Sequence, residues 1–207
     1  MMMSTHGYSD SIHHALAFCA KHHPGPVSRH DGHSALLSTA NVAVILSRHQ
    51  ADETTIVAAI LKFLVDASPQ ERLAPLQQNI ARRFGGMVAA AVEAAAEPRF
   101  DPMGRERTWK ACRFEVLARL AGASARVTDI WMASEIHTCG MALTDIRRLG
   151  AEYARSVSPA PLQDLLWWHG SILEVVGSRQ GEVRPSLTAE FRQLSSEVAA
   201  YLSEGAS

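Results

Sequence analysis

The sequence has few cysteines, no long apolar run and no signal for secretion. Its three cysteines are widely spaced and form no CxxC pair: Cys19, Cys112 and Cys139. Such a set suits a reducing compartment better than a disulfide framework. No uninterrupted apolar run approaches the ~20 residues of a membrane-spanning helix. The first ten residues, MMMSTHGYSD, lack the charged and apolar regions of a signal peptide. We therefore expect a cytoplasmic protein with no membrane partner.

A surplus of charge of either sign is also absent. The sequence contains 20 Lys and Arg residues and 21 Asp and Glu residues, so the formal net charge is -1. A dedicated nucleic-acid-binding protein usually carries a basic surplus, so we expect no nucleic-acid partner, although this balance is compatible with a local basic pocket. Apolar residues make up 47% of the 207 residues, which is enough for a sizeable core in one domain.

The sequence does contain helical periodicity along almost its whole length. A strand pattern of period two is not sustained anywhere. Capping residues, apolar spacing and glycine or proline breaks predict an all-α fold, with one domain at residues 9–203 after a flexible N-terminus at residues 1–8. The predicted helices cover residues 9–22, 34–49, 53–67, 69–84, 87–97, 105–121, 124–138, 141–156, 161–179 and 188–204.

Local patterns predict details of these helices. Ser68 and Pro69 stand in the order of a helix cap followed by a first-turn proline, so we expect Ser68 to cap the next helix. Gly85 can take the left-handed conformation that ends that helix. The helix at residues 34–49 is expected to have one apolar face, which is formed by Leu36, Leu37, Ala40 and Val44.

The order of these features resembles the HD-domain superfamily, in particular its RelA/SpoT-like branch and the small alarmone hydrolases. The resemblance extends over residues 8–202, and no single motif of the family is intact. The segments that carry it are FCAKHHPGPVSR, NVAVIL, AAILKFLVDA, NIARRFGGMVAAAVEAAAE and ARVTDIWMASEIHT. The resemblance implies an HD-domain-like helical bundle.

In that family two His and two Asp side chains hold a divalent metal, commonly manganese, which polarises a phosphoryl oxygen and activates a water molecule. By the resemblance, the first His matches His23, or His22 with a shift of one residue. The adjacent His-Asp pair matches Lys62 and Phe63, and the distal Asp matches Ser134. A protonated lysine cannot ligate a metal, and phenylalanine has no ligand atom. His23 is therefore the only matching ligand, and we expect no metal cofactor.

Lys62 places one positive charge near the point where the resemblance puts a doubly charged ion. Asp66 lies four residues later, on the same helical face, and an acidic residue at this point acts in catalysis in the family. Asp66 is thus the candidate catalytic residue. Here we expect it to pair with Lys62, because a paired charge is the less costly way to bury a lysine, and we expect Phe63 to fill the volume of the metal. The alternative is a rotated helix on which Lys62 extends to solvent.

The resemblance also implies ligand-binding residues. Lys21 and Arg29 resemble basic residues that line the phosphate and nucleotide pocket in the family. Thr138 falls near a nucleotide-contacting Asn and keeps a hydrogen-bonding group without the amide. The predicted ligand-binding set is Lys21, His23, Arg29, Lys62, Asp66, Ser134 and Thr138.

Two further groups of residues have alternative interpretations. The histidine-rich loop at residues 22–33 could form an improvised zinc site, but it has no standard ligand spacing, so a solvated polar loop is the default. His137, close after Ser134, is either a core histidine or a surviving titratable group of the pocket. Tryptophans supply large packing areas and are expected in the core, namely Trp131, Trp167 and Trp168.

Three functions remain open from the sequence. The first is a catalytically inactive HD-domain protein that binds a phosphorylated small molecule, such as a nucleotide, or a protein partner. The second is a phosphohydrolase of nucleotides or alarmones with a manganese or zinc site rebuilt from His22, His23, His30 or Asp129. The third is a helical scaffold that forms a homodimer. The lost ligands favour the first and third over the enzyme.

We expect the purified protein to contain no stoichiometric manganese, iron or zinc, because a single histidine does not hold a labile dication against water. Elemental analysis of protein purified without chelator tests this expectation. A stoichiometric metal ion that is lost in His23→Ala would contradict it and would favour the rebuilt-site enzyme.

Overall fold

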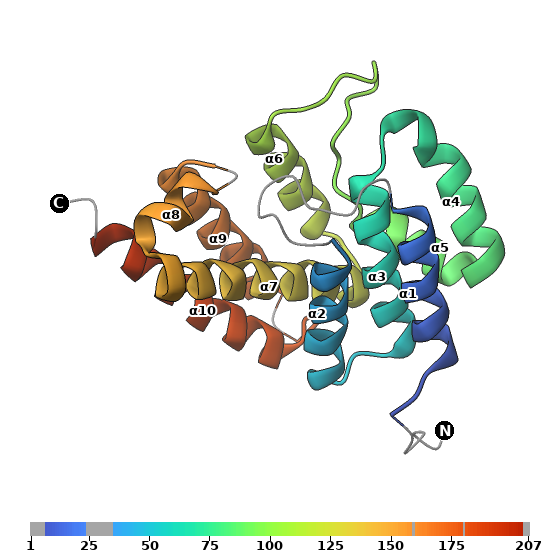
Figure 1. Cartoon of the computed structure of the whole chain (residues 1–207), viewed down its shortest axis with the longest axis horizontal. Helices are drawn as coiled ribbons and strands as arrows, with labels where there is room; N and C mark the ends of the chain where they lie inside the picture. The colour runs from blue at the N-terminus through green and yellow to red at the C-terminus, as the bar shows by residue number, and fades with distance from the viewer. Residues whose placement is uncertain (1–6, 24–34, 159, 180, 205–207) are drawn as a thin grey trace.

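The protein is built from α-helices, as the computed structural model shows (Figure 1). In the part of the chain that the structure describes, the only β feature is an isolated bridge between Phe100 and Glu106, so the all-α prediction is confirmed. The predicted flexible terminus, residues 1–8, lies almost entirely outside that part. The described residues are 7–23, 35–158, 160–179 and 181–204.

Ten helices follow one another within the described residues. Their bounds are α1 (Asp10–His22), α2 (Ala35–Arg48), α3 (Glu53–Ala67), α4 (Gln70–Phe84), α5 (Gly86–Ala95), α6 (Trp109–Leu120), α7 (Ala125–Leu149), α8 (Ala151–Ser156), α9 (Leu162–Gly177) and α10 (Pro185–Glu204). α3 packs against α1, α2, α5 and α7, while α10 lies along α7 (Figure 1). α7 therefore joins the half of the molecule built from α1–α5 to the half built from α8–α10. No helix within the described residues is both long and apolar enough to cross a membrane.

α3 carries one cation into the core. The Asp52 side chain caps the helix by accepting a hydrogen bond from the Thr55 backbone N–H at 2.8 Å. Every residue from Thr55 to Lys62 is buried. A helix that is buried on all sides is normally apolar on all sides, and Lys62 is the only charged residue in this stretch.

The junction between α3 and α4 differs from the prediction. The Ser68 hydroxyl donates to the Leu64 carbonyl oxygen at 2.7 Å, so it closes α3 and does not cap α4. Pro69 is the residue before α4, and it makes no side-chain capping bond. The reason is burial, because Ser68 is shielded from water and its hydroxyl takes the carbonyl one turn back. Gly85 ends α4 with a φ of 84°, as expected.

α7 is longer than the sequence predicts. Separate helices were expected at residues 124–138 and 141–156, but α7 runs without interruption through Gly140 and ends at Gly150. A glycine in a helix interior costs only about 1 kcal/mol, and the buried side chains on either side of Gly140 outweigh this cost. Gly150 has a φ of 90°, a left-handed conformation that ends the helix.

The predicted apolar face of α2 is wrong. The residues buried on this helix are Thr39, Val42 and Leu46, whereas Leu37 and Val44 are more than half exposed at 57% and 51%. α2 has apolar residues on more than one face, so its sequence alone does not select the buried one. The choice is made by tertiary contact, because α2 packs against both α3 and α7.

The tryptophans occupy the core as predicted. Trp131 and Trp168 are buried, and their ring centroids lie 6.2 Å apart in an edge-to-face arrangement. Trp109 packs against Trp168 in a similar way at 6.5 Å. Trp167 is partly buried and its ring contacts that of Phe114 at 4.6 Å. Edge-to-face packing is a favoured geometry for aromatic pairs, so this cluster ties α6, α7 and α9 together.

We expect Gly140→Ala to stabilise the protein by about 0.5–1 kcal/mol, because Gly140 is helical and a Cβ there meets nothing within 4 Å. Gly150→Ala is the matched control and should destabilise by about 1–3 kcal/mol, because its φ of 90° strains any other residue. Urea unfolding of both variants measures the difference. Destabilisation by Gly140→Ala would show that α7 is broken at this point.

Candidate functional site

The candidate site is centred on Lys62 and Asp66 of α3. The Lys62 side chain is buried, with a residue exposure of 4%, and its Nζ lies 2.5 Å from Oδ2 of Asp66. The two residues stand one helical turn apart, so the helix itself brings them together. The expected pairing is therefore present, and the alternative in which Lys62 extends to solvent is not what the structure adopts.

Aromatic rings complete the surroundings of the Lys62 ammonium. Nζ lies 4.5 Å from the ring centroid of Trp131 on α7 and 5.3 Å from that of Phe63. A cation within about 6 Å of an aromatic face is attracted by the ring quadrupole, more strongly when water is excluded. Phe63 is partly buried and packs against the core, so an apolar ring lies where the resemblance puts a metal-binding carboxylate.

Asp66 is held by two other contacts, and one of the two donor residues also reaches Ser68. Its Oδ1 accepts a hydrogen bond from the Glu97 backbone N–H at 2.8 Å. The guanidinium of Arg99 donates to the backbone carbonyl oxygens of Asp66 and Ser68. Burial raises the pKa of the Asp66 carboxyl above its ordinary value, although the nearby Lys62 ammonium acts in the opposite direction.

A second ion pair continues the network towards α6. The Glu97 carboxylate and the Arg113 guanidinium meet at 2.5 Å. The Arg113 guanidinium carbon lies 4.9 Å from the ring centroid of Trp168 and 5.1 Å from that of Trp109. Sequence reasoning missed Glu97, Arg99 and Arg113. The available signal was the charged segment EPRFDPMGRER at the end of an alanine-rich helix, of which residues 98–104 are predicted from the sequence only as a break between two helices.

The remaining predicted residues on α7 form bonds within the helix. The Ser134 side chain is buried and its hydroxyl donates to the Ile130 carbonyl oxygen at 2.8 Å. Thr138 is exposed, and its hydroxyl donates to the Ser134 carbonyl oxygen at 3.0 Å. Both hydroxyls thus follow the ordinary pattern of helical Ser and Thr residues.

The predicted residues at the end of α1 are placed in part. Lys21 is exposed in the last turn of α1, and His23 is the partly buried residue that follows the helix. The ring of His22 contacts that of Phe18 at 4.4 Å. Arg29 lies outside the described residues, as do the other polar residues of the histidine-rich loop, namely His30, Asp31 and His33.

Asp129 and His137 are both buried on α7. The Asp129 carboxylate pairs with Arg184 at 3.1 Å, so it already has a counter-charge. Burial raises the pKa of Asp129, and Arg184 opposes this shift. Asp129, which the rebuilt-site alternative would recruit as a ligand, is thus paired with an arginine instead.

The divalent metal that the resemblance implies does not fit the residues at this position. Lys62 is an ammonium held by Asp66, Phe63 has no ligand atom, and the Ser134 hydroxyl is bonded to its own helix. Within the described residues, no group of three or more His, Cys, Asp and Glu side chains is arranged to hold a metal ion. We therefore derive no chemical step through a metal here.

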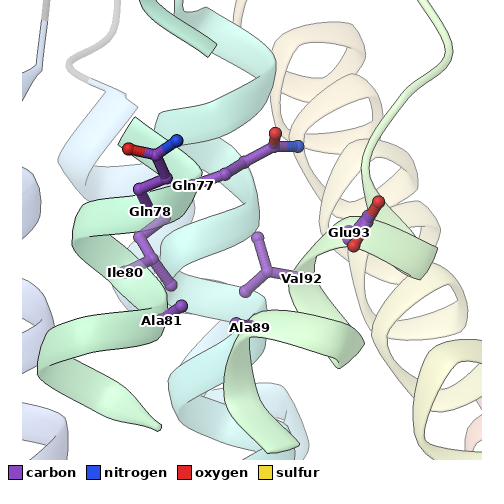
Figure 2. Close-up of a pocket in the computed structure, with 7 residues that line it drawn as sticks. All are labelled: Gln77, Gln78, Ile80, Ala81, Ala89, Val92 and Glu93. Carbon is purple, nitrogen blue, oxygen red and sulfur yellow. The ribbon is translucent and has the colours of Figure 1, made fainter. Parts of the chain in front are cut away.

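Cavities lie away from this network. A groove of about 230 Å³ runs between α4 and α5, and Figure 2 shows its lining side chains coming from both helices. A second cleft, of about 250 Å³, is lined by residues of α1, α3, α4 and α5, including His14 and Arg83. Of the predicted ligand-binding residues that the structure describes, none lines either one. The groove residues are Gln77, Gln78, Ile80, Ala81, Ala89, Val92 and Glu93.

Comparison with known proteins agrees with the fold. The family model described as HD domain matches residues 15–147. The Listeria monocytogenes EGD-e protein lmo0812 is 17% identical, with a TM-score of 0.63 over 79% of this chain and 94% of that chain. A protein described as a metazoan ortholog of SpoT that hydrolyzes ppGpp is 18% identical, with a TM-score of 0.65 over 92% and 96%. No curated protein matches the sequence.

We expect Lys62→Met and Asp66→Asn each to destabilise the protein by about 3–5 kcal/mol, because each leaves one buried partner without its counter-charge. The double variant should cost less than the sum, since it removes both charges and leaves neither without its counter-charge. The cost of Lys62→Met should grow as the pH rises. A carboxyl whose pKa is raised by folding stabilises the fold while protonated and loses that contribution once it ionises.

Urea unfolding of the three variants at two pH values measures these free energies. The partly exposed pair Lys110 and Asp164, also 2.5 Å apart, provides the control, and Lys110→Met should cost less than about 1 kcal/mol. Additive costs for Lys62→Met and Asp66→Asn would mean that the two charges do not interact.

Proposed function

This chain belongs to the HD-domain family, and on that premise we propose that it binds a phosphorylated small molecule and does not hydrolyse it. The family is of the phosphohydrolase type, as the SpoT-like structural relative illustrates. The proposal is that the fold has been kept while the metal-dependent chemistry has been lost.

The observation that carries this proposal is the Lys62–Asp66 ion pair, in which Lys62 stands where the resemblance puts the His of the family's adjacent His-Asp pair. Metal-dependent hydrolysis needs a dication that lowers the pKa of bound water and so generates a nucleophile at neutral pH. A lysine ammonium carries half the charge of such an ion and coordinates no water in this way. Its charge is further offset by Asp66. A bound phosphate ester would therefore meet no activated attacking group.

Binding is supported by the cations that surround this position. Lys62 and Arg113 belong to one network through Asp66 and Glu97, and guanidinium groups bind phosphate oxygens through paired hydrogen bonds. Lys21 on α1 and Thr138 on α7 are exposed and supply a further cation and a hydroxyl. A phosphate group is the ligand chemistry that such residues recognise.

The ppGpp activity of the SpoT-like relative makes guanosine polyphosphates the first ligands to test. We expect calorimetry to show weak to moderate binding that falls with rising salt, because exposed charges are screened, and we expect no release of phosphate or pyrophosphate. Lys21→Ala should weaken binding, whereas Lys110→Ala on α6 is the matched control. Absence of heat at millimolar ligand would contradict binding, and enzymatic turnover would favour the rebuilt-site phosphohydrolase.

Restoring the family ligands tests the lost chemistry directly. The triple variant Lys62→His, Phe63→Asp and Ser134→Asp, together with the native His23, should bind manganese, as measured by elemental analysis and by a metal-dependent rise in melting temperature. Phe63→Asp alone should destabilise by roughly 2–4 kcal/mol, because it removes a packed ring and places a carboxylate against the core. An unchanged melting temperature for Phe63→Asp would invalidate the match of Phe63 to the family's Asp.

A further inference from the structure

The segment between α5 and α6 forms a hairpin at residues 97–107. The Asp101 backbone N–H donates to the Arg105 carbonyl oxygen at 2.9 Å, and the Arg107 N–H donates to that of Arg99 at 2.7 Å. Gly104 makes the turn with a φ of 81°. In Figure 1 this segment runs out from the helices between α5 and α6.

The hairpin is attached to the body mainly by polar contacts at its base. The Glu97 backbone N–H is bonded to the Asp66 carboxylate, and Arg99 reaches the carbonyl oxygens at the end of α3. The Glu97 side chain pairs with Arg113 of α6. By contrast, Pro98 is the only buried residue of the hairpin, and Met103 near its tip is 76% exposed.

A unit held in this way opens more readily than the core. Segments with few buried apolar contacts and many exposed groups open locally at a free energy well below that of global unfolding. Water can replace the polar contacts of Glu97 and Arg99 once the hairpin moves. The apolar core around α3 and α7 does not depend on the exposed part of the hairpin.

Opening of the hairpin would also change the local charge. As described, Lys62 of α3 and Arg113 of α6 are balanced by Asp66 of α3 and Glu97 of the hairpin. Moving the hairpin away removes Glu97 together with the cation Arg99, whose own partner Glu106 also lies on the hairpin. Lys62, Arg113 and Asp66 then remain, and they carry one net positive charge in a poorly hydrated place. Such a place attracts anions.

We propose that the 97–107 hairpin is a clasp that must open before an anionic group reaches the Lys62 ammonium. Asp66 holds the hairpin closed, because one of its carboxylate oxygens accepts a hydrogen bond from Lys62 and the other accepts one from the Glu97 N–H of the hairpin. This inference rests on the proposed function for the identity of the anion as a phosphate, whereas the movement of the clasp can be tested without any ligand.

The test is the reactivity of the Lys62 amine towards an acylating reagent, read by mass spectrometry. In the wild type, Lys62 should react far more slowly than the exposed Lys110 of the same molecule. Arg99→Ala removes the bonds to the end of α3 and should raise the labelling rate of Lys62 by about tenfold or more, since a charged hydrogen bond is lost. Arg105→Ala is the matched control, because Arg105 pairs with Asp101 inside the hairpin, and it should leave Lys62 labelling unchanged.

Hydrogen exchange of the hairpin amides provides an independent readout, with Arg99→Gln as a second variant and thermal melts to confirm folding. Unchanged Lys62 labelling in folded Arg99 variants would overturn the clasp, as would wild-type labelling of Lys62 at the rate of Lys110. Calorimetry with guanosine polyphosphates then separates the two proposals. Faster labelling with tighter phosphate binding supports both, whereas faster labelling without phosphate binding supports the clasp and overturns the proposed function.

Discussion

The need to neutralise one buried ammonium group determines the arrangement of the candidate site. Lys62 lies on a stretch of α3, Thr55 to Lys62, that is otherwise uncharged and is buried along its whole length. An isolated charge in such a place is costly unless it is paired and hydrogen-bonded. Asp66 supplies the counter-charge and Trp131 supplies an aromatic face. Asp66 is itself partly buried and accepts a hydrogen bond from the Glu97 N–H, so the hairpin helps to satisfy the carboxylate that neutralises Lys62.

Further charge pairs and aromatic contacts connect the surroundings of Lys62 with other helices of the fold. The Glu97 carboxylate forms an ion pair with the Arg113 guanidinium. That guanidinium lies against the rings of Trp109 and Trp168. The centre of the site is therefore linked to α6, α7 and α9 through charges and aromatic rings. The resemblance puts a metal ion, bound from solution, at this position in the family. Here the positive charge is a covalent part of the chain.

The sequence predicted those features that depend on neighbours along the chain. The helical class and the Lys62–Asp66 pair follow from periodicity and from a spacing of four residues, which are local properties. The contacts of Glu97 and Arg99 join residues about thirty positions apart in the chain, and no periodicity reveals them. The same limit explains the error on α2, where packing against α3 and α7 selects the face, and the error at Gly140, where buried neighbours outweigh a helix-breaking residue. The ligand-binding set stays a prediction, and Arg29 lies outside the described residues.

The Lys62–Asp66 pair also makes it difficult for a metal centre to arise at this place. The construction of a metal centre by single substitutions would pass through proteins in which Lys62→His weakens the counter-charge of Asp66, or in which Phe63→Asp adds a second carboxylate beside it. Each such intermediate is less stable by an amount comparable to a large part of the total stability of a typical domain, and none of them yet holds a metal. A metal centre at this place could therefore arise only through several changes at once.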